Sequence, residues 1–292
     1  MIENQFKLSK QLTQMKNSQM SLSARFKSIK RDADYVSNIK DLYPGVGKYW
    51  PVVGNLRCGA WYVDPQICLN DGLKTSSSLE TETSKFKLLS KSKSSKELKE
   101  TSNIVAKNHP TTCYFKSSDG HSRQFHFSQS RVNLHLLKLI QTHGGVIIVD
   151  ATRRGKKYPD SLSKTVPVWC CVMNVLLGFE PYLDLPPWLM ECEVDMIKNA
   201  IPACVSAAKS VINVDILPKL DKPLRMAWCH QGCEHIFSSN EDLHEFNTVL
   251  GVSASDCKTA AEYREEFSWH YIQGAADDEE SRVNSGSNLN SD

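Results

Sequence analysis

The chain has 292 residues, of which 40% are hydrophobic, so it is long enough and apolar enough to bury the core of one large domain. Its formal net charge of +2 hides an asymmetry: residues 1–170 carry 27 Lys and Arg against 13 Asp and Glu, whereas residues 171–292 carry 8 against 20. This composition excludes a chain that is disordered throughout, and the basic first part predicts a polyanionic partner.

The ten cysteines do not indicate a disulfide framework. The chain is long, no signal peptide opens it, and cysteines such as Cys170 and Cys171 sit in apolar runs, where cysteine is commonly a small buried residue. No apolar run approaches the roughly 18 residues that span a membrane. We therefore expect a soluble, cytoplasmic protein with no membrane partner.

The amino-terminal part begins with a polar stretch, residues 1–20, which we expect to be frayed. In residues 22–42 apolar side chains recur at helical spacing, which predicts an amphipathic helix that covers the domain and ends before Pro44. Its expected apolar stripe comprises Leu22, Phe26, Ile29, Ala33, Val36 and Ile39. Residues 70–110 hold 13 Ser and Thr and 8 Lys, a composition typical of a disordered insertion.

Regular elements alternate through the rest of the chain. The expected strands are residues 113–116, 124–127, 146–149, 224–229 and 248–252, the first two forming a hairpin through Asp119-Gly120. The expected helices are residues 133–142, 166–177 and 188–220, the last broken at Pro202. Helices that alternate with short apolar strands predict an α/β or α+β fold: a mixed sheet flanked by helices in a single main domain.

The stretch 144–169, GGVIIVDATRRGKKYPDSLSKTVPVW, carries the strongest functional signal. Its buried strand ends at Asp150, and a hydroxyl, four cations and a glycine follow. An α/β protein often presents a phosphate site in this way, because glycine admits close approach and arginine offers a planar fork to phosphate oxygens. The candidate phosphate ligands are Thr152, Arg153, Arg154, Lys156 and Lys164. A solvated basic loop after a core strand is the alternative.

Three other blocks accompany this stretch: NLRCGAWY at 55–62, CYFKSSDGHSRQFHFSQSRVNLHLLKLI at 113–140 and WHYIQGAADDEES at 269–281. Together and in this order they resemble the initiator tRNA phosphoribosyl transferase family. The resemblance implies an enzyme, a tRNA 2′-O-ribosylphosphate transferase. Such an enzyme moves a ribosyl phosphate from phosphoribosyl pyrophosphate (PRPP) to the 2′-hydroxyl of a T-stem adenosine in initiator methionine tRNA, and so excludes that tRNA from elongation.

On this resemblance the family's amino-terminal domain spans residues 21–281, interrupted by the insertion at 70–110, and residues 282–292 form a disordered tail. Family members continue into a phosphatase-like domain, which we expect to be absent from this chain. A non-catalytic tRNA-binding module or an inactive truncated isoform is therefore the alternative to an active enzyme. A phosphate-binding domain that acts on a nucleotide unrelated to tRNA is a third hypothesis.

The chemistry of PRPP assigns roles to the candidate residues. Its leaving group is a magnesium-bound pyrophosphate, so Mg²⁺ is the expected cofactor and Asp150 is the candidate for a metal or ribose contact. Asp119 and His121 are candidates for the general base toward the 2′-hydroxyl, with a plain hairpin turn as the alternative. The candidates for tRNA or donor phosphates are Arg57, Lys116, Arg123 and Arg131.

Two further clusters give weaker signals. The first, Cys229, His230, Cys233 and His235, mixes zinc-binding residue types, but its spacing is too cramped for paired ligand knuckles, so no zinc is expected. The second, the acidic run at 277–280, is typical of a solvated surface. Its place in the block QGAADDEES leaves a role in the site open.

Overall fold

A computed structural model of the chain describes residues 22–64, 112–117, 127–238, 245–258, 262 and 269–277. Its centre is a six-stranded sheet in the order β2-β1-β3-β6-β4-β5. The strands are β1 (Val52–Asn55), β2 (Thr112–Cys113), β3 (Gly145–Asp150), β4 (Leu224–His230), β5 (Phe237–Ser238) and β6 (Asn247–Ser253). Neighbours from β2 to β4 pair in parallel, and β5 pairs antiparallel with β4. The expected mixed sheet flanked by helices in a single domain is confirmed.

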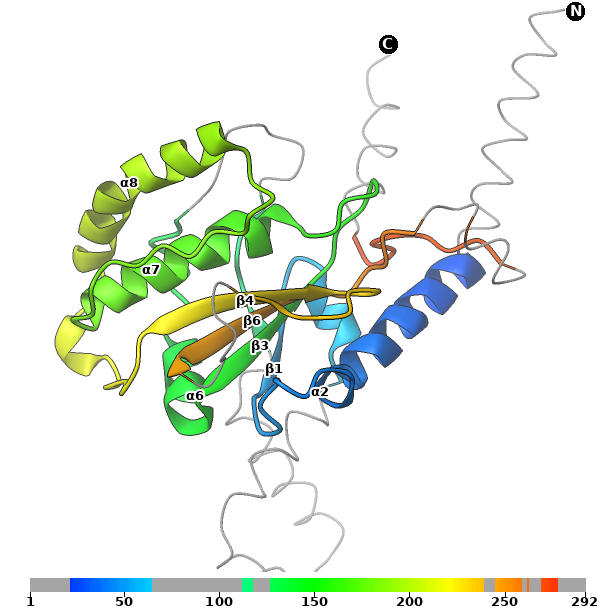
Figure 1. Ribbon diagram of the computed structural model, residues 1–292, viewed down its shortest axis with the longest axis horizontal. Coiled ribbons are helices and arrows are strands. Elements are labelled where there is room, and N and C mark those ends of the chain that lie inside the picture. The colour runs from blue at the N-terminus through cyan, green and yellow to red at the C-terminus, as the bar shows by residue number, and fades with distance from the viewer. Residues whose placement is uncertain are drawn as a thin grey trace, which may run out of the picture.

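Helices cover both faces of this sheet, with α7 and α8 on one side and the helix over residues 22–37 on the other (Figure 1). Seven shorter or later helical elements follow the helix over residues 22–37 in the described part of the chain. They are α2 (Ile39–Leu42), η1 (Gly59–Tyr62), α6 (His135–His143), η3 (Ser161–Thr165, a π-helical turn), α7 (Val166–Leu176), α8 (Glu191–Lys209) and η4 (Val214–Ile216).

The central strand β3 separates two apolar cores. Its Val146 and Ile148 side chains belong to a core with residues of α6 and α7. Its Ile147 and Val149 side chains belong to a second core with residues of the amino-terminal helices. All six residues of β3 are buried, as expected for a parallel strand that is covered on both faces.

Three details of the helices differ from the sequence prediction. The helix expected at 188–220 is shorter, since α8 ends at Lys209. Leu22 and Phe26 are 65% and 67% exposed, because the first turns of their helix bury Ala24, Ser28 and Asp32 instead. The predicted apolar stripe is therefore wrong in these turns, where the buried face combines Ala24 with the polar residues Ser28 and Asp32. The predicted break at Pro202 is also wrong, since α8 continues through it; the residue is exposed, so water can reach the carbonyl that lacks its N–H partner.

The other predicted strands and helices at 133–142, 146–149, 166–177, 224–229 and 248–252 are confirmed within a few residues. Gly144 ends α6 in the left-handed conformation, with φ of +74°. Several expectations lie outside the described residues. These are the frayed segment 1–20, the insertion 70–110, the return strand of the hairpin and the tail 282–292.

The strand order places a reversal in the middle of the sheet. The chain leaves β1 toward β2 on one side and leaves β3 toward β4 on the other. In open α/β sheets, ligands bind outside the carboxyl ends of the strands at such a reversal. The register sets Asp150 of β3 beside Ser253 of β6, and Ser253 beside His230 of β4, along what we call the carboxyl edge.

Gly59, the first residue of η1, lies directly against the carbonyl of Val149 in β3, and a Cβ there would collide with the carbonyl oxygen. We predict that Gly59→Ala lowers the free energy of unfolding by about 2–3 kcal/mol, measured by urea denaturation. Ser23→Ala, at an exposed position of the first helix, should change it by less than about 0.5 kcal/mol. Equal stability of the two variants would contradict this close approach.

Candidate active site

Asp150 is a fully buried carboxylate at the carboxyl end of β3. Its Oδ1 accepts hydrogen bonds from the Ala151 backbone at 2.8 Å and the Cys58 thiol at 3.0 Å. Its Oδ2 accepts from the Asn55 amide at 2.8 Å and the Ser161 hydroxyl at 2.5 Å. A buried charge is tolerated only when it is well hydrogen-bonded, so these donors fix the ends of β1, β3 and η3 relative to one another.

The Cys58 thiol is suited to this role. Burial raises its pKa, and the Asp150 carboxylate beside it acts in the same direction. The sulfur therefore stays protonated and donates its hydrogen to the carboxylate. Cys58 is a structural donor in this arrangement.

Asn55 extends the contact to the segment that follows β2. Its Oδ1 accepts from the Phe115 N–H at 2.8 Å, and its Nδ2 donates to the Phe115 carbonyl at 2.9 Å. The Ser161 N–H donates to the Ser117 hydroxyl at 3.3 Å. The beginning of the block 113–140 is thereby held beside β1 and β3.

Two arginines share one carboxylate at this edge. Asp277 Oδ2 lies 3.3 Å from Arg57 Nη1 and 3.4 Å from Arg153 Nε. Arg57 also donates to the Ala151 carbonyl at 2.8 Å. The Asp277 side chain is 5% exposed, and those of Arg57 and Arg153 are 15% and 21% exposed. We call these three residues the arginine cluster; its partial burial strengthens the interaction of its charges with an anion.

The basic loop, residues 153–157, turns sharply above the cluster. Arg154 and Gly155 have φ of +60° and +75°, in the left-handed region. Gln273 holds the turn from two sides, accepting from the Gly155 N–H at 2.7 Å and donating to the Lys156 carbonyl at 2.8 Å. The last of the family-like blocks therefore shapes the loop that carries the candidate phosphate ligands.

That last segment, residues 269–277, is anchored by a buried carboxylate in the first helix. Asp32 accepts from the Tyr271 hydroxyl, which lies 3.0 Å from both carboxylate oxygens, and from the Gln231 amide at 2.8 Å. Burial raises the pKa of Asp32 well above its ordinary value, and these two hydrogen bonds act in the opposite direction. The first helix and residues 269–277, from the two ends of the described chain, are thus joined to each other.

The two lysines predicted as phosphate ligands differ in exposure. Lys164 is buried in η3, and its ammonium pairs with Glu193 at 2.7 Å and Asp160 at 3.2 Å. Lys156 is exposed and pairs with the other oxygen of Asp160 at 3.1 Å. Lys164 therefore ties η3 to α8, whereas Lys156 lies where a ligand can reach it.

Thr152 and Arg154 also differ in their surroundings. Thr152 is buried, and the Ser255 hydroxyl accepts from its N–H at 3.0 Å and donates to its carbonyl at 2.8 Å. Arg154 is exposed on the basic loop. The structure thus gathers Asp150, Arg153, Arg154 and Lys156 near one edge, and their predicted ligand roles stay predictions.

Among the candidates for tRNA contacts, Lys116 and Arg131 are exposed. The Arg131 guanidinium lies 3.9 Å from the centroid of the Tyr114 ring, a cation–π arrangement that holds it in place. Three predicted residues lie outside the described part of the chain: Asp119, His121 and Arg123.

The sequence pattern predicts a solvent-exposed position for Asp277, and the structure buries it. A run of four acids favours a solvated surface, yet Asp277 is buried against two arginines. The usable signal is its position in a block that resembles the family. Asn55 and Cys58 lie in another such block, but an amide and a thiol carry no signal of their own because both are common in structural roles.

The mixed Cys and His cluster makes local contacts. The His230 Nδ1 lies 2.6 Å from the Gln231 carbonyl, and the His230 N–H donates to the Cys233 sulfur at 3.3 Å. Burial lowers the pKa of His230. Within the residues that the structure describes, no three His, Cys, Asp or Glu side chains converge as a metal site.

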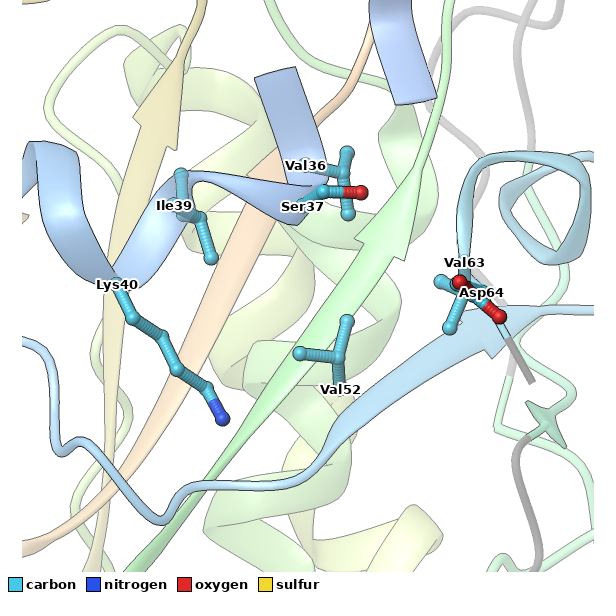
Figure 2. A pocket seen from close by; sticks show the side chains of 7 residues that line it. All are labelled: Val36, Ser37, Ile39, Lys40, Val52, Val63 and Asp64. Carbon is cyan, nitrogen blue, oxygen red and sulfur yellow. The ribbon is translucent and has the colours of Figure 1, made fainter. Parts of the chain in front are cut away.

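A small cavity of about 30 Å³ lies between the amino-terminal helices and β1 (Figure 2). It is lined by Val36, Ser37, Ile39, Lys40, Val52, Val63 and Asp64. Its volume is far below that of a typical ligand pocket. A larger hollow of about 420 Å³, with His143 and Lys222 in its lining, opens at the amino ends of the strands, opposite the arginine cluster.

The fold and this edge define an α/β protein with a mixed, mostly parallel sheet and a group of partly buried and exposed cations at the reversal of that sheet. The chain belongs to the family described as the Rit1 N-terminal domain, which matches residues 15–86 and 103–290. This confirms the family predicted from the four sequence blocks.

Two curated relatives extend the comparison. The chain is 35% identical over 267 residues to an uncharacterized protein of Schizosaccharomyces pombe. This alignment covers 88% of this chain and 48% of that protein. It is 31% identical over 305 residues to the tRNA A64-2′-O-ribosylphosphate transferase of Saccharomyces cerevisiae. This alignment covers 90% of this chain and 51% of that protein. The chain spans about half the length of these relatives. No solved structure matches it.

In the described part of the chain, no helix has both the length and the apolar character needed to cross a membrane.

Replacing Asp150 tests its role as the central acceptor of this edge. In Asp150→Asn, the new amide must face donors from Asn55 or Cys58, so at least one buried donor loses its acceptor. We predict a loss of about 2–4 kcal/mol in the free energy of unfolding, measured by urea denaturation. The control Asp215→Asn, at an exposed position, should stay within about 0.5 kcal/mol of the parent chain. A stable Asp150→Asn variant would refute the assignment.

The raised pKa of Asp32 makes a pH-dependent prediction. A carboxyl with a raised folded pKa favours the folded state while protonated, and this advantage is lost as pH rises from about 4, the unfolded value, through the folded pKa. Asn does not titrate, so the free energy of unfolding of Asp32→Asn relative to that of the parent chain should increase between about pH 4.5 and about pH 7.5. Asp34→Asn, exposed on the same helix, is the control. A pH-independent difference in urea midpoints would show that Asp32 does not titrate abnormally.

Proposed function

We propose that this chain is the donor-binding part of a tRNA 2′-O-ribosylphosphate transferase. It would transfer a ribosyl phosphate from PRPP to the 2′-hydroxyl of a T-stem adenosine in initiator methionine tRNA, and thereby exclude that tRNA from elongation. Support comes from its family and from the name of the Saccharomyces cerevisiae relative. We expect it to act in the cytoplasm.

The arginine cluster is the observation that carries this proposal. Arg57 and Arg153 converge on one carboxylate oxygen of Asp277, beside the carboxyl ends of β1 and β3. A pyrophosphate offers several oxygens to two guanidinium groups at once, and can replace Asp277 as their partner. Arg57, which the sequence assigns to tRNA or donor phosphates, is mostly buried in this cluster, and this favours the donor.

In the proposed step, the 2′-oxygen of the acceptor forms a bond to C1 of the donor ribose. The bond from C1 to the pyrophosphate breaks, and the pyrophosphate leaves with the electron pair. Arg57 and Arg153 would stabilise the charge that develops on the leaving oxygens. The hydroxyl proton passes to a general base, for which Asp119 and His121 stay the candidates.

The remaining cations divide between donor and acceptor. Arg154 and Lys156 are exposed on the basic loop, and we assign them to the 5′-phosphate of the donor. Lys116 and Arg131 are exposed beyond β2, and we assign them to the tRNA backbone, which proteins read through phosphates and 2′-hydroxyls.

Mg²⁺ is expected to enter with the pyrophosphate of the donor, because it commonly binds through substrate phosphates and keeps several waters. The described residues do not form a preassembled group of metal ligands. Both oxygens of Asp150 accept hydrogen bonds from the protein, so we propose that Asp150 positions the loop.

The direct test is transfer of labelled ribosyl phosphate from PRPP to purified initiator tRNA, with elongator methionine tRNA as the control. Product on the initiator alone is the expected result. If neither tRNA is modified while initiator tRNA still binds, the chain is a binding module and the proposed activity is wrong for it.

Charge reversal separates donor binding from tRNA binding. Arg153→Glu should weaken binding of PRPP in the presence of Mg²⁺ by about 100-fold or more, because it removes one guanidinium and adds a repelling carboxylate. Affinity for tRNA should change by less than about fivefold, since other cations contribute. Lys138→Glu, exposed on α6, is the matched control and should preserve donor binding in calorimetry. Equal losses of both affinities in Arg153→Glu would make the loop an RNA contact.

A further inference from the structure

Two stacked aromatic rings border the basic loop on the side of β4. Tyr158 follows the loop directly, and its ring lies parallel to that of Trp188, with centroids 4.4 Å apart and an interplanar angle of 9°. Two T-shaped ring contacts hold the pair as well. Trp228 meets Trp188 with centroids 5.8 Å apart and an interplanar angle of 79°, and His230 meets Tyr158 at 5.4 Å and 83°.

Trp188 reaches this position from the connection between α7 and α8. Pro186 and Pro187 precede it and restrict its backbone. Its indole N–H lies 3.4 Å from the Ser163 hydroxyl in η3. Despite these contacts, Trp188 is 40% exposed, while Tyr158 behind it is 6% exposed. An exposed indole that is already held in place loses little freedom when it binds a flat partner.

The charges around the pair indicate what that partner is. Lys157, on the adjoining loop, is exposed, and it follows Arg154 and Lys156, which we assign to the donor. The charge of Lys157 also reaches His230, whose pKa is lowered first by burial and further by that lysine. A partly exposed aromatic ring beside a basic loop is a combination with which proteins bind RNA, because bases stack on the ring while phosphates contact the cations.

The position of the pair fits an acceptor that lies beside the donor. His230 and Asp150 stand at the same level of the sheet and are separated by β6. Two strand spacings amount to about 10 Å. The aromatic pair and the arginine cluster therefore occupy neighbouring parts of one edge.

We propose that Trp188, supported by Tyr158, is a stacking platform for a nucleobase of the tRNA acceptor. This inference rests on the proposed function in that it names the binding site of the acceptor. It makes Trp188 an RNA-binding residue that determines affinity for the acceptor and leaves the donor site unchanged.

The test is equilibrium binding of labelled initiator tRNA to the full chain without PRPP, followed by fluorescence anisotropy. Trp188→Leu should weaken binding by about tenfold, because it keeps an apolar side chain but removes the aromatic face, whereas Trp188→Phe should stay within about threefold. The matched control is Tyr182→Leu. Tyr182 is 41% exposed and stacks on Arg225 near the amino end of β4, so this variant should stay within about twofold.

The salt dependence separates stacking from charge. Trp188→Leu should lower affinity by the same factor at each salt concentration, whereas Lys157→Ala should reduce the salt slope. Unchanged affinity in Trp188→Leu, or equal losses in the Leu and Phe variants, would overturn the platform. If the parent chain transfers no ribosyl phosphate but Trp188→Leu still loses tRNA affinity, the proposed activity fails and the platform stands.

A second measurement uses the unaltered chain, so it tests the proposal even if the Trp188→Leu variant does not fold. Ultraviolet crosslinking of bound tRNA, followed by mass spectrometry, should attach RNA to the peptide that contains Trp188. Crosslinks confined to peptides that lack Trp188 would contradict the proposal.

Discussion

The buried carboxylate of Asp150 is the constraint on which the carboxyl edge depends. It lies where β3 ends, and its hydrogen bonds reach the end of β1 through Asn55, the turn into η1 through Cys58 and the start of η3 through Ser161. A buried charge without these donors would cost several kcal/mol, so the three segments must meet in one arrangement. The carboxyl ends of β1 and β3, where the strand order reverses, are therefore fixed relative to each other before any ligand arrives.

The proposed anion site lies on this edge, and residues 269–277 complete it. Asp277 holds Arg57 and Arg153 at one point, and Gln273 sets the turn of the basic loop. Asp32 in the first helix supports both through Tyr271. Cations that are oriented in advance stabilise developing negative charge without reorganising during the reaction, and this links the fold to the proposed chemistry. Segments from opposite ends of the sequence are needed for one site.

The regular elements could be predicted from the sequence because their signals are local. The run 146–149 has the composition of a strand buried on both faces, and apolar spacing marks α6 and α7. The position of the basic loop at the end of a buried strand could be predicted because Asp150 ends that strand and glycine and arginines follow, and its role as a phosphate site stays a prediction. The buried face of the first turns of the first helix could not be predicted, because it includes the polar residues Ser28 and Asp32. Asp277 and Trp188 could not either, because their roles depend on partners distant in the sequence.

The most direct test of the account is a crystal structure of the chain with inorganic pyrophosphate and Mg²⁺. The account predicts the anion at the carboxyl edge, with its oxygens on Arg57 and Arg153 and with the Asp277 carboxylate displaced from at least one of them. An anion bound only in the hollow at the amino ends of the strands, beside His143 and Lys222, would contradict it. An arginine cluster that keeps Asp277 as its partner while the pyrophosphate binds elsewhere would also contradict it.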